Sequence, residues 1–184
     1  MAESDFAKIA NHKDKMIKEL TFIGGKTGIK WQQIERDADG EEHINGCSIE
    51  SSGPARDAFN DAVDSLKPYI IDYLIEKADR ELKEYWEVQL FITKLSFSIT
   101  KAGKAAKIYA TFLGGDNNKT SFVLPAVDLY NPEVRTHQNG SAITYGEGYT
   151  KIIEQVIQES KIYLSGDRGA MQQTLKEETE PAAE

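Results

Sequence analysis

The stretch LTFIGGKTG at residues 20–28 recurs 75 residues further on as LSFSITKAG at residues 95–103. The two copies share a leucine, a hydroxyl residue, a phenylalanine, a lysine and a glycine at matching positions. Each copy lies in a group of predicted strands that leads into a predicted helix. The sequence therefore predicts an α+β fold of two tandem similar units, each an antiparallel three-stranded group followed by a helix, with an extra N-terminal helix.

Alternating apolar and polar residues predict the strands. The first group comprises residues 20–23, 29–35 and 43–50, with turns at Gly24-Gly25 and Asp39-Gly40. The second group comprises residues 87–100, 104–113 and 120–124. Alternation changes parity near Thr93, which predicts a bulge or a break in that strand.

Apolar residues at helical spacing predict four helical segments. An amphipathic helix is expected over residues 5–18, and another begins at Gly53-Pro54. Pro68 interrupts that pattern before it resumes over residues 69–86, so either the helix kinks or a second helix begins there. The last helix covers residues 149–163 and stops at Gly166.

These elements predict three regions. Residues 1–86 hold the N-terminal helix and the first unit, and residues 87–166 hold the second unit. A long loop at 125–148 interrupts the second unit and contains a predicted hairpin about Asn139-Gly140. Residues 167–184 form a polar, acidic tail with no apolar periodicity.

Composition narrows the functional classes. The net charge of −8 argues against a general nucleic-acid coat protein. No apolar run reaches the roughly 20 residues of a membrane span, and the acidic N-terminus lacks the features of a signal peptide, so we expect a cytoplasmic protein. Cys47 is the only cysteine, which excludes an intrachain disulfide and favours a packed core thiol over a nucleophile.

No catalytic or metal-binding pattern is present in the sequence. The three histidines fall in separate elements, without the spacing of a metal site or a nucleophile's base. Acidic residues around Gly40 resemble part of a calcium loop, but a hairpin turn explains them better. The run 24–28 resembles a phosphate-binding loop, but a strand follows where that loop needs a helix. We therefore expect a non-catalytic protein with no cofactor.

A basic region lies in the second strand group. Between Thr93 and Lys119 five lysines face a single acid, Asp116, and the lysines are Lys94, Lys101, Lys104, Lys107 and Lys119. These lysines either contact phosphates or simply lie on the solvent-exposed face of a sheet and keep the protein soluble. The first helix would add a second basic surface through Lys8, Lys13, Lys15 and Lys18.

The long loop is the other candidate site. Its aromatic rings and guanidinium group could stack on or contact a base, a nucleotide or a nucleic-acid strand, and these residues are Tyr130, Arg135, His137 and Tyr145. Tyr149 starts the apolar stripe of the last helix and is expected in the core. The loop aromatics could alternatively close an oligomer interface.

Residues 18–166 resemble small proteins of undetermined role encoded by tailed bacteriophages and prophages. The resemblance lies in the helix start at 54–59, a second strand group ending in Pro125, the pair Asn131-Pro132 and a terminal helix ending near Gly166. The resemblance implies that the gene lies near phage replication or recombination genes. It does not identify any site residues.

Three functions follow as hypotheses. The first is a non-catalytic, homo-oligomeric accessory protein of phage DNA replication or recombination, with its lysines on the phosphate backbone. The second is a binder that sequesters a small nucleotide signal under the long loop, as a counter-defence. The third is a structural or protein-interaction module.

Overall fold

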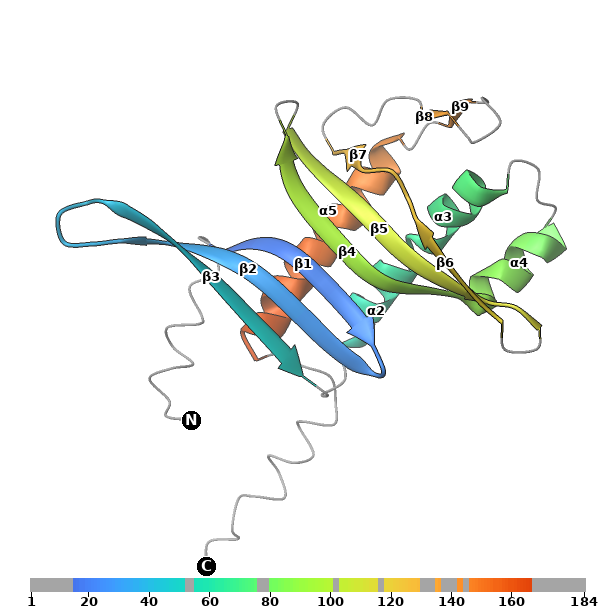
Figure 1. Ribbon diagram of the computed structural model, residues 1–184, viewed down its shortest axis with the longest axis horizontal. Helices are drawn as coiled ribbons and strands as arrows, with labels where there is room; N and C mark the ends of the chain where they lie inside the picture. Colours follow the sequence, from blue (N-terminus) through green and yellow to red (C-terminus); the bar gives the residue numbers. More distant parts are fainter. Residues whose placement is uncertain are drawn as a thin grey trace, which may run out of the picture. The chain divides into compact units, whose positions relative to one another are not determined.

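The computed structural model describes residues 15–51, 55–75, 80–100, 103–115, 118–129, 135–136, 142–143 and 146–166. They form a mixed α+β protein with antiparallel strands, which confirms the α+β character of the predicted fold; the two tandem similar units stay a prediction (Figure 1). Contacts divide these residues into unit 1, which contains residues up to 60 and from 157 onward, and unit 2, which contains residues 61–156. The predicted boundary between residues 86 and 87 stays a prediction.

Unit 1 contains a three-stranded antiparallel meander. Its strands are β1 (Lys15–Ile23), β2 (Lys26–Arg36) and β3 (Glu42–Ser51), with β2 in the middle. Gly24 and Gly25 both have positive φ, at 61° and 73°, which is the geometry of a tight two-residue hairpin turn. Gly40, with a φ of 83°, ends the turn between β2 and β3. Both turns predicted from the sequence are therefore confirmed.

Aromatic side chains pack between the strands and the helices of unit 1. Helix α2 (Asp57–Asp64) carries Phe59, which is almost fully buried. The Phe59 ring meets Phe22 of β1 at 5.9 Å and Tyr163 of α5 (Gly146–Leu164) at 6.1 Å, both edge to face. Arg56 and Glu159 form an ion pair at 3.2 Å beside this core.

The predicted N-terminal helix is wrong at its C-terminal end, because Lys15 to Lys18 belong to strand β1. Residues 5–14 of that prediction lie outside the described residues. Register with β2 shifts between Ile17 and Glu19, so Ile17 and Leu20 both point into the core. This bulge produces a three-residue apolar spacing that is also typical of a helix.

Unit 2 contains helices α3 (Lys67–Leu74) and α4 (Arg80–Gln89), followed by a second antiparallel meander. The strands are β4 (Leu90–Thr100), β5 (Gly103–Leu113) and β6 (Lys119–Val123), and β7 (Val127–Asp128) also pairs with β5. The hairpin of β8 (Arg135–Thr136) and β9 (Ala142–Ile143) confirms the predicted pairing about Asn139-Gly140.

The helix predicted over residues 69–86 differs from the structure. A new helix, α3, begins at Lys67 with Pro68 in its first turn, where the missing N–H group needs no partner. Helix α4 extends to Gln89, so the first three residues of the predicted strand at 87–100 are helical. The last helix, α5, and its stop at Gly166, with a φ of 93°, are confirmed.

Both meanders carry a bulge in their first strand. The register of β4 with β5 shifts between Ile92 and Lys94, which confirms the bulge predicted near Thr93. The bulges at Lys18 and Thr93 are 75 residues apart, the same offset as the sequence repeat. This match favours a duplication, which stays a prediction. None of the helices in the described part combines the length and apolar character that crossing a bilayer requires.

Candidate nucleic-acid interface

The meander of unit 2 has one covered face and one open face. Leu95, Ile108 and Ala110 point toward the helices and are at most 1% exposed. Figure 1 shows α3 and the N-terminal part of α5 behind these strands. Side chains alternate across a strand, so the opposite, uncovered face carries a defined set of residues. This set, here called the open face, consists of Phe91, Lys94, Ser96, Lys107, Tyr109, Thr111, Leu113, Lys119, Ser121 and Val123.

Strand register arranges the open face in rows. Phe91 lies opposite Thr111, which lies opposite Ser121. In the next row Lys94 lies opposite Tyr109, which lies opposite Val123. Two further pairs flank these rows, Ser96 with Lys107 on one side and Leu113 with Lys119 on the other. The rows therefore place aromatic groups at the centre and lysines on both sides.

Tyr109 is the centre of a positively charged cluster. The ammonium nitrogens of Lys94 and Lys107 lie 5.2 and 5.5 Å from the centroid of its ring. Cation–π attraction of this kind holds an ammonium group near a ring face. The Thr93 hydroxyl at the bulge donates a hydrogen bond to the backbone carbonyl of Tyr109 at 3.3 Å, which ties the bulge to this position.

Only some of the predicted lysines share the open face. Lys94, Lys107 and Lys119 lie on it, and neither Lys107 nor Lys119 forms an ion pair with a carboxylate of the described chain. Lys104 pairs with Ile99 in register and lies at the hairpin end on the opposite face. Lys101 lies outside the described residues.

None of the long-loop candidates has a side chain among those that the structure describes. Tyr130, His137 and Tyr145 lie outside the described residues, and the structure places only the backbone of Arg135, in β8. Tyr149 is buried and its ring packs edge to face against Tyr69 at 5.4 Å. The expectation that Tyr149 belongs to the core is therefore confirmed.

The corresponding face of unit 1 has its charges paired. Lys26 pairs with Glu50 at 3.0 Å, and Lys30 pairs with Glu19 at 2.8 Å. A shallow depression of about 390 Å³ lies between strands here, and Lys26 and Glu50 are among its lining residues. Because each lysine already meets a carboxylate, this face offers less net positive charge to an anion than the open face of unit 2.

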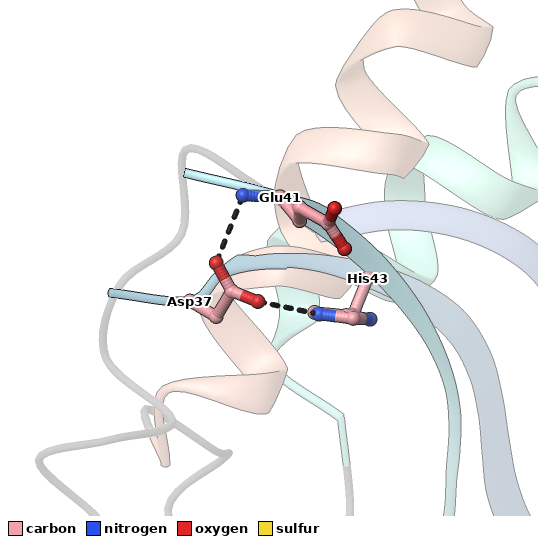
Figure 2. Close-up of side chains that lie close together, drawn as sticks. All are labelled: Asp37, Glu41 and His43. Atoms are coloured by element: carbon pink, nitrogen blue, oxygen red, sulfur yellow. Dashed lines mark hydrogen bonds and ion pairs between the residues drawn. The ribbon is translucent and has the colours of Figure 1, made fainter. Parts of the chain in front are cut away.

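Asp37, Glu41 and His43 gather at the exposed tip of the β2–β3 hairpin (Figure 2). One carboxylate oxygen of Asp37 accepts hydrogen bonds from the backbone N–H groups of Asp39 and Glu41, at 3.0 and 2.9 Å. The other lies 3.1 Å from Nε2 of His43. The bond to His43 is the main reason that the pKa of Asp37 falls below its usual value. These bonds close the turn, as the hairpin interpretation of this acidic stretch predicts.

A buried lysine lies at the start of β1. Lys15 is only 3% exposed, and its ammonium nitrogen lies 5.8 Å from the centroid of the Trp31 ring. Burial lowers the pKa of Lys15. Cys47 lies opposite Trp31 in register and is a half-buried free thiol. The expectation that Lys15 faces solvent on a basic helix is therefore wrong.

Sequence reasoning missed Phe91 and Tyr109 as parts of a site. The signal was available, because the parity change at Thr93 puts Phe91 and Lys94 on one face of β4. Counting alternate residues in β5 then adds Lys107 and Tyr109 to that face.

Comparison of the chain with known protein families, with curated proteins and with solved structures returned no match. The functional argument therefore rests on the residues and their geometry.

Proposed function

We propose that the protein is a non-catalytic nucleic-acid-binding accessory protein whose open face contacts the phosphate backbone. The observation that carries the proposal is the cluster of Lys94 and Lys107 at the Tyr109 ring, on a sheet face that no described helix covers. The resemblance to tailed-phage proteins supplies the proposed setting, which is phage DNA replication or recombination.

Electrostatics favour an anion at this cluster. Two ammonium groups near one ring repel each other, and an anion beside them is attracted by both. Lys119 extends the positive charge to the far side of the aromatic rows. The described acid on the same side of the strands is Asp128, opposite Ala105, which lies beyond the Ser96–Lys107 row. A phosphate backbone that follows the rows can therefore contact three lysines without meeting that carboxylate.

The net charge of −8 limits binding to this face, because the rest of the chain repels a polyanion. Binding of this type is strongly weakened by salt and is modest in affinity. Among the described residues of the open face, none pairs a nucleophile with a histidine or carboxylate base. We therefore propose binding without a chemical step.

The test is fluorescence anisotropy with a labelled 20-nucleotide DNA strand at low salt. Lys94→Glu/Lys107→Glu reverses two charges on the open face, and we expect at least about tenfold weaker binding. Lys104→Glu/Lys151→Glu is the matched control, because it makes the same change in net charge at exposed lysines away from that face. Thermal unfolding checks that both variants are folded.

Equal weakening in the two variants would mean that overall charge, and not the open face, determines binding. Unchanged affinity in the Lys94/Lys107 variant would remove this face as the interface. The proposed homo-oligomer is tested on the same samples by light scattering, with a mass above 20.6 kDa expected.

A further inference from the structure

We infer that the ligand of the open face is single-stranded, with a base stacked on Phe91 and phosphates at the lysines around Tyr109. This inference rests on the proposed function and names the class of nucleic acid that the same face would bind. It comes from the aromatic and apolar groups of that face, which phosphate contacts alone do not explain.

Phe91 is 46% exposed, and Val123, on the next row, is 55% exposed. A large apolar side chain left in water is costly, and an exposed phenylalanine beside lysines and hydroxyl groups suits contact with the face of a base. On the covered face the rings pack against one another, since Trp86 stacks on Phe112 at 4.1 Å and meets Phe122 at 6.1 Å. Phe91 makes no such ring contact within the described chain.

The exposed ring of Phe91 can accept an unstacked base. Phe91 lies opposite Thr111, two residues from Tyr109 on β5, so Phe91 and the lysines around Tyr109 are neighbours on the open face. In a duplex the base faces are already stacked on each other and cannot accept an aromatic side chain. In a single strand the bases can be splayed out and each can stack on an aromatic side chain.

The width of the face also argues against a duplex. The major groove admits an α-helix or a two-stranded ribbon. The open face has three strands, β4, β5 and β6, and its rows of side chains cross all of them. It therefore matches the flat sheets on which single strands lie.

Polar groups complete the arrangement. Thr111 and Ser121 lie beside Phe91, with their hydroxyl oxygens 3.4 Å apart. Hydroxyl groups can donate to or accept from base edges and phosphates. Lys107 and Lys119 lie on opposite sides of the two aromatic rows, so phosphates on both sides of the stacked base can be neutralised.

Four probes test the inference on the full chain by anisotropy competition. They are a 12-nucleotide oligo(dT), a 12-nucleotide oligo(rU), an abasic 12-mer with the same number of phosphates, and a blunt DNA duplex. We expect oligo(dT) or oligo(rU) to bind more tightly than both the abasic strand and the duplex. The tighter of the two identifies DNA or RNA as the source of the strand.

The matching variant is Phe91→Ala. Loss of one stacked base should weaken oligo(dT) binding roughly 5- to 140-fold while leaving abasic binding unchanged. Ile44→Ala is the control, because it removes another exposed apolar side chain from a strand of unit 1. The comparison of probes on the unmodified protein does not depend on whether a variant folds.

The outcomes separate the two proposals. Equal affinity for oligo(dT) and the abasic strand would overturn stacking but leave phosphate binding in place. Tighter binding of the duplex would overturn the single-strand assignment. No binding of any probe at low salt would overturn the proposed function itself.

Discussion

Neutralising the three lysines of the open face should remove the salt dependence of nucleic-acid binding in equal steps. The perturbation is Lys→Gln at Lys94, Lys107 and Lys119, singly and then together. Glutamine keeps a polar side chain of similar reach and removes the charge. Each lysine should account for one phosphate contact, because register places the three at separate positions on the face.

The magnitude follows from counterion release. For single strands the slope of log K against log salt is about −0.7 for each neutralised phosphate, so three contacts give a slope of about −2. A fourfold rise in salt, from 50 to 200 mM, should then weaken binding about 18-fold. One substitution should reduce that loss to about sevenfold, and the triple variant should show almost none.

The assay is an equilibrium anisotropy titration of a labelled oligo(dT) at three salt concentrations. Lys104→Gln serves as the control, since Lys104 lies on the other face and should leave the slope unchanged. A triple variant that keeps the slope of the unmodified protein would refute the assignment of phosphate contacts to these lysines. So would a control that lowers the slope as much as Lys107→Gln does.

Three further predictions concern the scaffold. Phe59→Ala should lower the free energy of unfolding by about 3–5 kcal/mol, because it leaves a cavity between two rings; urea titration measures this. Gly28→Ala should destabilise the protein, because its new Cβ would collide with the Thr21 hydroxyl, and adding Thr21→Ala should recover much of the loss. Since the pKa of Asp37 is lowered, its contribution to stability is present above the unfolded value of about 3.9 and is lost as the pH falls through the lower folded value. Unfolding measured from pH 6 to 2 should show that Asp37→Asn lacks this acid-dependent component, and an identical pH profile would contradict the contribution of the Asp37 carboxylate.

Turn chemistry made most of the strands predictable. Adjacent glycines at Gly24-Gly25 strongly favour a two-residue hairpin, and an aspartate followed by Gly40 favours the second turn. The C-terminal end of the predicted N-terminal helix was wrong for a physical reason that recurs in the chain. A bulge at Lys18 changes the apolar spacing of a strand from two residues to three, and three is also a helical spacing.

The candidate site was predictable as a region and not as a surface. The count of lysines between Thr93 and Lys119 located the basic meander, but charge along a sequence does not distinguish the faces of a strand. The structure separates Lys104 from Lys94 and Lys107 by register alone. It also shows which aromatic residues accompany the lysines, which depends on how three strands pair.

The two bulges allow the faces of the two units to be compared position by position. The first cross-strand pair after the bulge is Glu19 with Lys30 in unit 1 and Lys94 with Tyr109 in unit 2. In unit 1 the pair is an ion pair at 2.8 Å. In unit 2 the residue that corresponds to the glutamate is a lysine, and it lies over a tyrosine ring.

The two units also differ just before the bulges. Met16 of unit 1 corresponds, at the same offset of 75 residues, to the exposed Phe91 of unit 2. A lysine, a tyrosine and an exposed phenylalanine placed together are what recognition of an anionic, aromatic ligand requires. The difference between matching positions supports the proposal that the open face of unit 2 binds the ligand, and this support does not depend on the charge count.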